Sequence, residues 1–275
     1  MATVIDRISR GILRLVGVRG RLVDSSVARH HVYDTGGSGS TIVCLPGLAD
    51  SAASWTPILL ALRRRGFRVV LIESAGHGLS SQPRSTYTID AHLAAIAEVL
   101  GQVVDQPALI VGNSLGGATA MHCAVVQPSR VRALFLTSPG GGTITPESLA
   151  ELRAVFTMRS TSEARAFVKR ILHRATRLHL ATARLMLAHT ASPAVRDLVA
   201  NLTTDHVIEG IGSIRVPITM IWGRSEHLLP PEALASLQQQ LPPHLVLEQP
   251  EGFGHCPHLD DPARLAKMIA AFATE

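Results

Sequence analysis

Ser114 lies in a setting that could make its hydroxyl a nucleophile. Glycines stand two positions before and after it, at Gly112 and Gly116. An apolar run, residues 108–111, precedes this motif, and a run with helical spacing follows it. A Gly-x-Ser-x-Gly motif between a strand and a helix is typical of a sharp turn that holds a serine hydroxyl above a sheet. Ordinary glycine-rich turns can share the motif, so the interpretation depends on partners for Ser114 elsewhere in the chain.

His255 is the residue that we predict as the base for Ser114. A serine hydroxyl is a poor nucleophile at neutral pH, so it needs a base within hydrogen-bond reach and a third group that fixes the tautomer of that base. His255 follows the apolar run 245–249 and precedes the last helical pattern. Loops at the carboxyl ends of strands are where catalytic groups gather in open α/β sheets. His258 is the local competitor, but it lies near a helix start and we expect it to make a structural hydrogen bond.

Glu226 is the residue that we predict as the acid that orients His255. It is the only carboxylate in the loop that follows the apolar run 218–222. A carboxylate can accept a hydrogen bond from one imidazole nitrogen and stabilise the imidazolium. A surface glutamate is the alternative interpretation. Asp260 and Asp261 are closer to His255 in the sequence, but we expect Asp261 to cap the last helix.

Two backbone N–H groups are candidates for an oxyanion hole. Acyl transfer through Ser114 needs such donors where negative charge develops on the substrate oxygen. We expect one from Leu115, directly after the serine, and the other from Leu48, in the loop after the apolar run 41–45. Gly47 allows an unusual backbone conformation that would direct the Leu48 N–H inward. A plain tight turn is the alternative for this loop.

The elements that must position these residues alternate along the chain. Short apolar runs followed by longer helical patterns predict a mostly parallel sheet with helices on both faces, an α/β fold. The predicted strands are residues 29–33, 41–45, 68–72, 108–111, 133–137, 218–222 and 245–249. The predicted helices are residues 55–65, 90–104, 116–127, 231–240 and 262–273, with Asp90 and Asp261 at or near the starts of two of them.

Residues 146–205 interrupt this alternation and predict a helical insertion, a cap or lid, in a core formed by residues 1–145 and 206–275. The segment has helical spacing and no convincing strand. Its larger apolar residues are Phe156, Phe167, Ile171, Leu178, Leu185 and Leu187. Between positions 159 and 184 its arginines and lysine are Arg159, Arg165, Lys169, Arg170, Arg174, Arg177 and Arg184, and the only acidic residue is Glu163. These charges could attract an anionic substrate or interface, but we favour a solvated outer helix face.

The length and composition indicate one large α/β domain. The chain has 275 residues, of which 46% are hydrophobic, enough for a sizeable core. No apolar run reaches the roughly 18 residues of a membrane span. Residues 2–17 do not fit a secretory signal, because arginines interrupt the apolar positions. Their apolar residues recur at helical spacing, which predicts an amphipathic helix. We expect this helix to pack on the domain, with a membrane surface as the alternative.

Cysteine and charge content narrow the location and the partners. Cys44, Cys123 and Cys256 are an odd number without metal spacing, which favours a reducing compartment and a cytoplasmic location. The net charge of +5 comes with only 4% aromatic residues and no compact basic motif, so we expect no nucleic-acid partner. The thirteen histidines have no paired ligand spacing, and we expect neither a metal nor a cofactor.

Four motifs together resemble the α/β-hydrolase superfamily, from about residue 29 to residue 273. The loop from Leu45 to Trp55 is similar to the oxyanion loop of the family, and residues 73–80 are similar to its Asp-x-x-Gly-His-Gly-x-Ser turn. Residues 222–230 resemble the acid loop and residues 254–262 the histidine loop. The resemblance implies an eight-stranded, mostly parallel sheet flanked by helices, with a helical cap.

The chain departs from the family pattern at three positions. Pro46 stands where many members have histidine, Glu73 replaces an aspartate of the structural turn, and Glu226 replaces the usual aspartate of the catalytic triad. Proline lacks an N–H, but the expected donor is the N–H of Leu48, so Pro46 removes no donor from the predicted oxyanion hole. We expect His77, in the structural turn, to be structural as well.

The identity of the nucleophile separates the subfamilies. Serine at position 114 argues against haloalkane dehalogenases and epoxide hydrolases, which use aspartate there. Asn113 before the serine resembles both C–C bond hydrolases of ring-fission products and a group of bacterial lipases. The C–C hydrolases usually have tryptophan after the catalytic histidine, and Cys256 stands there instead.

The resemblance therefore favours an esterase or lipase. It implies a Ser114–Glu226–His255 triad that hydrolyses a small apolar carboxylic ester through an acyl-enzyme, without a cofactor. A C–C bond hydrolase is the alternative, and Arg159 or Arg165 would then bind the substrate carboxylate. A binding protein with a vestigial site is a third hypothesis, disfavoured by the intact motifs.

Overall fold

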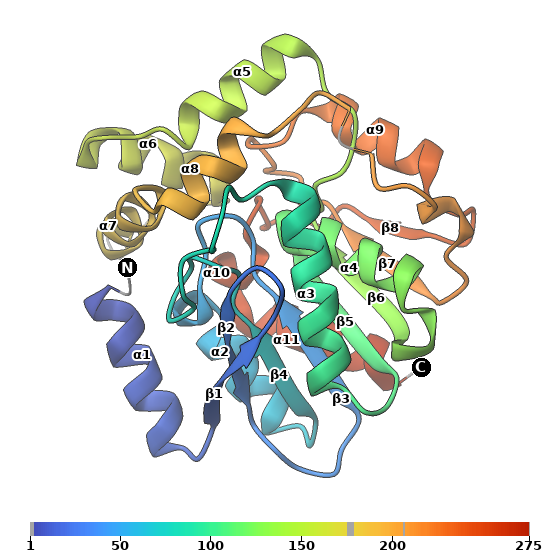
Figure 1. Cartoon of the computed structure of the whole chain (residues 1–275). Helices are drawn as coiled ribbons and strands as arrows, with labels where there is room; N and C mark the ends of the chain where they lie inside the picture. The colour runs from blue at the N-terminus through green and yellow to red at the C-terminus, as the bar shows by residue number, and fades with distance from the viewer. Residues whose placement is uncertain (1–2, 175–178, 206, 275) are drawn as a thin grey trace.

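The computed structural model describes residues 3–174, 179–205 and 207–274, and Figure 1 shows their arrangement. Two residues named above, Arg177 and Leu178, lie outside the described residues.

One mixed sheet runs through the centre of the molecule. Its order is β1-β2-β4-β3-β5-β6-β7-β8. The first three strands in that order pair antiparallel, and every following pair is parallel. The strands are β1 (Arg19–Asp24), β2 (Arg29–Asp34), β3 (Thr41–Leu45), β4 (Arg68–Ile72), β5 (Ala108–Asn113), β6 (Val131–Thr137), β7 (Ile218–Ile221) and β8 (Val246–Glu248). The predicted mostly parallel sheet is confirmed.

β1 is the strand that the sequence pattern did not reveal. It lies at the edge of the sheet, paired only with β2. Five of its six residues are exposed and only Val23 is buried. An edge strand with so little buried surface lacks the apolar alternation by which strands are recognised.

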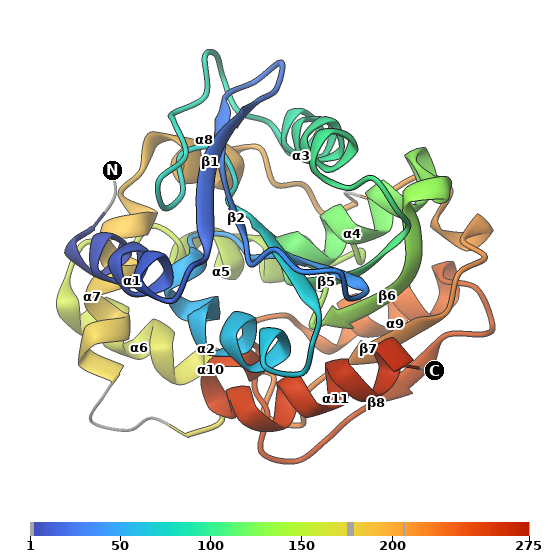
Figure 2. The ribbon, with the colours of Figure 1, turned by 90° about the horizontal axis from the view of Figure 1, so that it is seen from below.

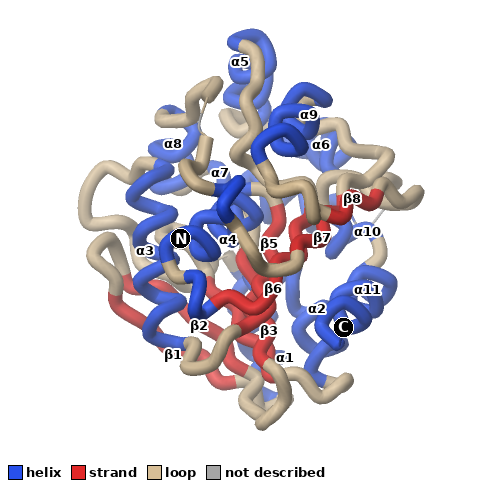
Figure 3. The backbone as a smooth tube through the Cα atoms, turned by 90° about the vertical axis from the view of Figure 1, so that its right-hand side faces the viewer, coloured by secondary structure: helices blue, strands red, loops and turns tan. Residues whose placement is uncertain are grey.

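Helices cover both faces of the sheet, as the sequence predicted. Figure 3 shows α3 and α4 on one side of the strands and α2 and α11 on the other. Ile96 and Met121 are buried between the sheet and the first pair, and Trp55 and Ile269 between the sheet and the second. These helices are α2 (Ala52–Arg63), α3 (Ile89–Val103), α4 (Leu115–Val126) and α11 (Pro262–Thr274). The other helices outside residues 146–205 are α1 (Val4–Leu15), α9 (Pro231–Gln240), α10 (Pro257–Asp260) and short 3-10 helices at Pro128–Arg130 and Ile211–Ser213.

Side chains at the helix starts explain where two of these helices begin. The Thr88 hydroxyl accepts from the Ala91 N–H at 3.2 Å and caps α3, so Asp90 lies in the first turn of that helix. Asp261 caps α11, because its Oδ1 accepts from the Arg264 N–H at 2.9 Å.

Helices α5 to α8 lie beyond the carboxyl ends of the parallel strands (Figure 1). They are α5 (Pro146–Val155), α6 (Thr161–Ile171), α7 (His179–Thr190) and α8 (Pro193–Ala200). A separate apolar cluster lies beneath them and includes Phe156, Phe167 and Ile171. The described residues of the predicted insertion contain helices and no strand.

The register of the sheet aligns the strand ends that carry the candidate residues. Leu45 pairs with Gly112, Asn113 pairs with Thr137, and Thr137 pairs with Ile221. Because neighbouring parallel strands end at the same level, the loops that follow β3, β5, β6 and β7 emerge side by side.

Candidate active site

Ser114 occupies a strained turn between β5 and α4. Its φ is 53° and its ψ is −119°, a backbone conformation that costs about 1–3 kcal/mol for a residue with a side chain. A Cβ on Gly112 would lie 2.3 Å from the Gly116 oxygen, and one on Gly116 would lie 2.0 Å from the Leu45 oxygen. Only glycine fits at either position, because the helix starts so close to the sheet.

Backbone hydrogen bonds stabilise this turn. The Ser114 N–H donates to the Thr137 carbonyl at 3.1 Å. The Ser114 carbonyl accepts from the N–H groups of Gly117 and Gly140, both at 2.9 Å. Bonds to β6, α4 and the loop after β6 therefore hold the residue in its unusual conformation.

His255 and Glu226 form a buried pair. The Nδ1 of His255 lies 2.8 Å from Oε2 of Glu226, and both side chains are at most 4% exposed. A carboxylate only accepts hydrogen bonds, so Nδ1 carries the proton in this pair. With Nδ1 engaged, Nε2 of His255 is the ring nitrogen left for a substrate or a nucleophile.

Glu226 is held in its ionised form. Burial alone would raise its pKa, but the charge and hydrogen bond of His255 and the Leu229 N–H keep that pKa below its ordinary value. Its Oε1 accepts from the N–H groups of Leu228 and Leu229 at 2.7 and 3.0 Å. Both carboxylate oxygens are therefore engaged, one on the loop and one on the imidazole.

The acid loop and the histidine loop are joined through their backbones. The N–H groups of Arg224 and Ser225 donate to the carbonyls of Pro250 and Phe253 at 3.2 and 3.0 Å. A Cβ on Gly223 would lie 2.2 Å from the Phe253 oxygen, so this close approach requires glycine. The two loops present Glu226 and His255 as one unit.

Asn113 connects the turn at Ser114 to the loop that carries His255. Its Nδ2 donates to the His255 carbonyl at 2.8 Å and to the Thr137 carbonyl at 3.0 Å. This buried amide fixes the His255 backbone relative to Ser114. In the sequence Asn113 served only to distinguish subfamilies. No local pattern relates it to His255, because the two residues are far apart along the chain.

The loop after β3, predicted to supply the Leu48 N–H, approaches Ser114 closely, but not for the expected reason. Gly47 has no left-handed backbone, and the residue with positive φ is Ala49, at 60°. A Cβ on Gly47 would lie 3.2 Å from the Ser114 Cβ, so glycine gives the loop room beside the serine. No described group accepts a hydrogen bond from the N–H of Leu48 or Leu115.

His77 and Glu73 accept hydrogen bonds from backbone N–H groups in and next to this loop. His77 Nε2 accepts from the Ala49 N–H at 3.0 Å, and burial lowers the pKa of His77 to about 4, so the ring is a neutral acceptor. Glu73 accepts from the N–H groups of Ala52 and Leu79 at 2.9 and 2.8 Å, and burial raises its pKa to about 7. These contacts agree with the structural roles expected for the turn.

His258 and Asp260, which lie near His255 in the sequence, contact residues other than the His255 ring. His258 stacks on Trp55 and its Nε2 lies 3.2 Å from Oδ2 of Asp50. Asp260 accepts from the N–H groups of Gly254 and His173 at 2.7 and 2.8 Å. Asp260 therefore joins residues 146–205 to the histidine loop and is not a partner of the His255 ring.

Two cavities meet at Ser114. One of about 20 Å³ is lined by Leu48, Ser114 and His255 among others. The other, of about 100 Å³, lies between the sheet edge and α5, and no charged side chain lines it. Its lining is Leu48, Ile89, Ser114, Leu115, Ala118, Gly140, Gly141, Gly142, Ile144, Leu152, Phe156, Leu202, Leu228, Leu229 and Ala233.

This fold and these motifs match a known family along most of the chain. The model of the alpha/beta hydrolase family matches residues 42–268. The chain belongs to the alpha/beta hydrolase family. The matched region includes Ser114, Glu226 and His255.

Individual relatives of this alpha/beta hydrolase are distant. An uncharacterized protein of Mycobacterium tuberculosis is 27% identical over 260 residues, covering 86% of this chain and 76% of that protein. A 2-hydroxy-6-oxononadienedioate/2-hydroxy-6-oxononatrienedioate hydrolase of Burkholderia vietnamiensis is 26% identical, covering 90% and 92%. The crystal structure of a putative lipase from Acinetobacter baumannii superimposes with a TM-score of 0.80 at 20% identity, covering 99% and 96%. At that identity the structural likeness concerns the fold.

Proposed function

We propose that this alpha/beta hydrolase is a serine hydrolase of carboxylic esters. The observation that carries the proposal is the meeting of a strained Ser114 and the buried His255–Glu226 pair at one small cavity. A nucleophile, a base and an orienting acid in this arrangement support acyl transfer.

In the proposed mechanism, Ser114 attacks the acyl carbon while Nε2 of His255 takes the hydroxyl proton. Glu226 holds the imidazole in the required tautomer and stabilises the imidazolium. The N–H groups of Leu48 and Leu115 stabilise the oxyanion of the tetrahedral intermediate. His255 then returns the proton to the leaving alcohol. Water, activated by His255, hydrolyses the acyl-enzyme and regenerates Ser114.

The larger cavity supports an apolar acyl or alcohol group as the substrate's main binding element. Its side chains are apolar apart from the Ser114 hydroxyl, and such a lining favours aliphatic groups over charged ones. Leu152 and Phe156 come from α5 and its C-terminus, so we propose that residues 146–205 act as a cap that closes this cavity.

Replacement of the nucleophile tests the chemistry directly. We expect Ser114→Ala to lower kcat for p-nitrophenyl esters at least about a thousandfold, because no other hydroxyl replaces it. A fluorophosphonate probe should label the wild type and not the variant. Retained turnover in Ser114→Ala would contradict the mechanism.

A C–C bond hydrolase is the second candidate, because the relative from Burkholderia vietnamiensis is named as a hydrolase of dienedioates. Such a substrate carries carboxylates, and its binding requires a cationic side chain in the cavity. Arg159 and Arg165, considered for this role, are exposed and line neither of the two cavities at Ser114. Faster turnover of a ring-fission product than of every simple ester would favour this candidate over the ester hydrolase.

A further inference from the structure

Helix α1 directs a largely polar face toward the protein. Its buried residues are Asp6, Ser9 and Leu13. An amphipathic helix on a globular domain ordinarily buries its apolar stripe and exposes its polar face. α1 buries Leu13 and half-buries Ile5, but it also buries Asp6 and Ser9 and leaves its other apolar residues exposed, so its outer surface needs a different explanation.

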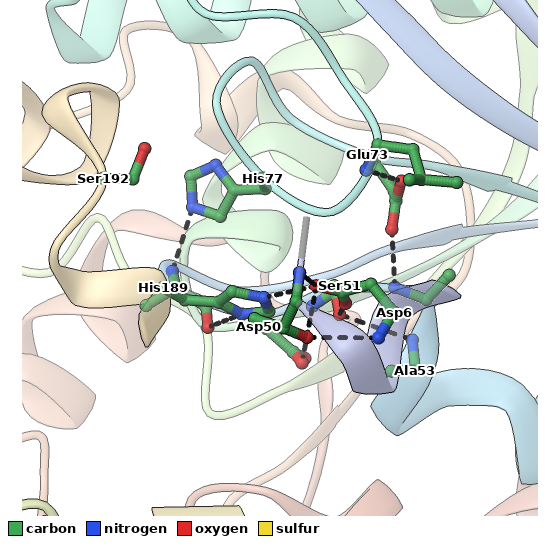
Figure 4. A network of polar contacts seen from close by, with 12 residues as sticks. Asp6, Asp50, Ser51, Ala53, Glu73, His77, His189 and Ser192 are labelled. Carbon is green, nitrogen blue, oxygen red and sulfur yellow. Dashed lines mark hydrogen bonds and ion pairs between the residues drawn. The ribbon is translucent and has the colours of Figure 1, made fainter. Parts of the chain in front are cut away.

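Specific polar contacts hold α1 in this orientation. Asp6 accepts from the Ser51 hydroxyl at 2.7 Å and lies 3.0 Å from Nε2 of His189, on α7. The Ser9 hydroxyl lies 2.6 Å from that of Thr56, on α2. Figure 4 shows Asp6 within this network, between the loop that precedes α2 and the cap segment. Rotation of the helix to bury its apolar residues would leave Asp6 without these partners.

The outer surface of α1 carries a continuous apolar stripe. At about 100° per residue, its exposed apolar residues fall within an arc of about 120°. They are Val4, Ile8, Ile12, Leu15 and, at the C-cap, Val16, with exposed fractions between 43% and 89%. Five of the nine large exposed hydrophobic residues in the described part of the chain therefore lie on this one element. Scattered exposed apolar residues are ordinary, but a stripe of this kind marks an interaction surface.

Arginines border the apolar stripe on the same helix. Arg7, Arg10 and Arg14 are exposed and fall within an arc of about 60° on the other side of the buried face. Arg10 and Arg14 also line a surface depression together with Arg19 and Arg21 of β1. The only acidic residue of α1 is Asp6, which is buried. The surface is therefore apolar and basic, and its complement is apolar and anionic.

We propose that α1 docks on the surface of an anionic lipid bilayer. The helix lies in the plane of the interface, with the apolar stripe among the acyl chains and the arginines at the lipid phosphates. This pairing of an apolar stripe with neighbouring cations is the pattern of helices that rest in a membrane interface. With 12 residues, α1 is about 18 Å long. Among the described residues no helix is long and apolar enough to cross a bilayer.

The position of α1 leaves it free to dock. It lies at the rim of the molecule, packed against α2 and β1 and joined to α7 through Asp6 and His189 (Figures 1 and 2). The proposal rests on this geometry and not on the ester chemistry of Ser114, so each can fail without the other.

The first test is sedimentation with lipid vesicles. The Ser114→Ala protein is used so that lipid hydrolysis cannot alter the vesicles. We expect it to bind vesicles of equal parts phosphatidylcholine and phosphatidylglycerol, and to bind pure phosphatidylcholine at least tenfold more weakly. Absence of binding to the anionic vesicles, or equal binding to both kinds, would overturn the proposal.

Substitutions in the apolar stripe locate the surface. We expect Ile8→Ser with Leu15→Ser to weaken vesicle binding roughly tenfold or more, because two side chains no longer enter the acyl region. The matched control, Val126→Ser with Val246→Ser, changes two exposed residues elsewhere and should leave binding unchanged. Circular dichroism establishes that both variants are folded. Equal binding by the stripe variant and the control would overturn the proposal.

Two further measurements distinguish an anionic bilayer from other partners of α1. We expect Arg7→Gln, Arg10→Gln and Arg14→Gln together to weaken anionic binding strongly, and Arg159→Gln, Arg165→Gln and Arg174→Gln to have little effect. Equal losses in the two triple variants would indicate general charge attraction and overturn the assignment to α1. A lipid-free dimer in light scattering that Ile8→Ser with Leu15→Ser dissociates would assign the surface to a second copy instead.

Discussion

Glu226 carries one more methylene than the aspartate usual at this position of the family. The longer side chain reaches His255 with one oxygen and accepts two backbone N–H groups of its own loop with the other. The carboxylate is thus held by the loop as well as by the imidazole. Its lowered pKa keeps it charged throughout the neutral range.

Glu226→Gln tests the role of this carboxylate. We expect kcat for p-nitrophenyl esters to fall roughly a thousandfold to ten-thousandfold, because a neutral amide neither fixes the tautomer nor stabilises the imidazolium. Glu251→Gln is the matched control, since the Glu251 side chain forms an exposed ion pair with Arg224 away from His255, and its activity should be near that of the wild type. Near-normal activity of Glu226→Gln would direct the search to another acid.

At the scale of elements, the pair between Asp6 and His189 joins α1 to α7. Both side chains are buried, at 2% and 4% exposed. Burial would lower the pKa of His189, but the hydrogen bond and charge of Asp6 raise it above its ordinary value. Burial would likewise raise the pKa of Asp6, but the contacts with His189 and Ser51 lower it well below its usual range.

These shifts predict how the pair contributes to stability as pH changes. Asp6 stabilises the fold above its unfolded pKa of about 3.9, and this contribution is lost as pH falls through its lower folded pKa. His189 stabilises the fold below its unfolded pKa of about 6.5, and this contribution is lost as pH rises through its raised folded pKa. The pair therefore contributes most between these two unfolded pKa values.

His189→Gln should lower the free energy of unfolding by about 3 kcal/mol near pH 6, because it leaves Asp6 buried without its cation. The difference from the wild type should shrink above the raised pKa of His189. Urea unfolding at a series of pH values measures both effects. His244→Gln is the control, since His244 is exposed and its Nε2 lies 3.0 Å from the Val216 carbonyl. A pH-independent difference would contradict the assignment.

At the scale of the whole molecule, the larger cavity lies between the sheet edge and residues 146–205. Phe156, at the C-terminus of α5, lines both cavities beside Ser114. The segment is anchored near the site, because the Ile171 carbonyl accepts from the Cys256 N–H at 3.0 Å and His173 Nδ1 lies 2.7 Å from the Ser225 hydroxyl. The size of the cavity thus depends on residues from both parts of the chain.

Phe156→Ala should shift the preference toward longer acyl chains. Removal of the ring enlarges a cavity of about 100 Å³, so we expect the ratio of kcat/KM for long over short p-nitrophenyl esters to rise several-fold. Val155→Ala, next to it in the chain but outside these two cavities, is the control. An unchanged ratio in Phe156→Ala would show that the acyl group binds elsewhere.

The sequence by itself determined the α/β class and the candidate residues Ser114, His255 and Glu226. These follow from local patterns: apolar runs at strand spacing, glycines around a serine, and polar residues directly after strands. The resemblance to the family rests on the same local motifs. Edge strand β1 was not predicted from the sequence, because it buries only one side chain.

Only the tertiary structure decided which distant residues meet. Asn113 and His255 are 142 positions apart, and Asp6 and His189 are 183 apart, so no local pattern relates them. Glycine is needed at position 47 because the loop lies against Ser114, and this contact also depends on the packing of two loops. Residues 2–17 have the pattern of an amphipathic helix, but only the fold established that Asp6 and Ser9 face inward and the apolar stripe faces outward. Hydrogen-bond partners and burial depend on the arrangement of the whole chain, whereas strand and helix patterns depend on neighbouring residues.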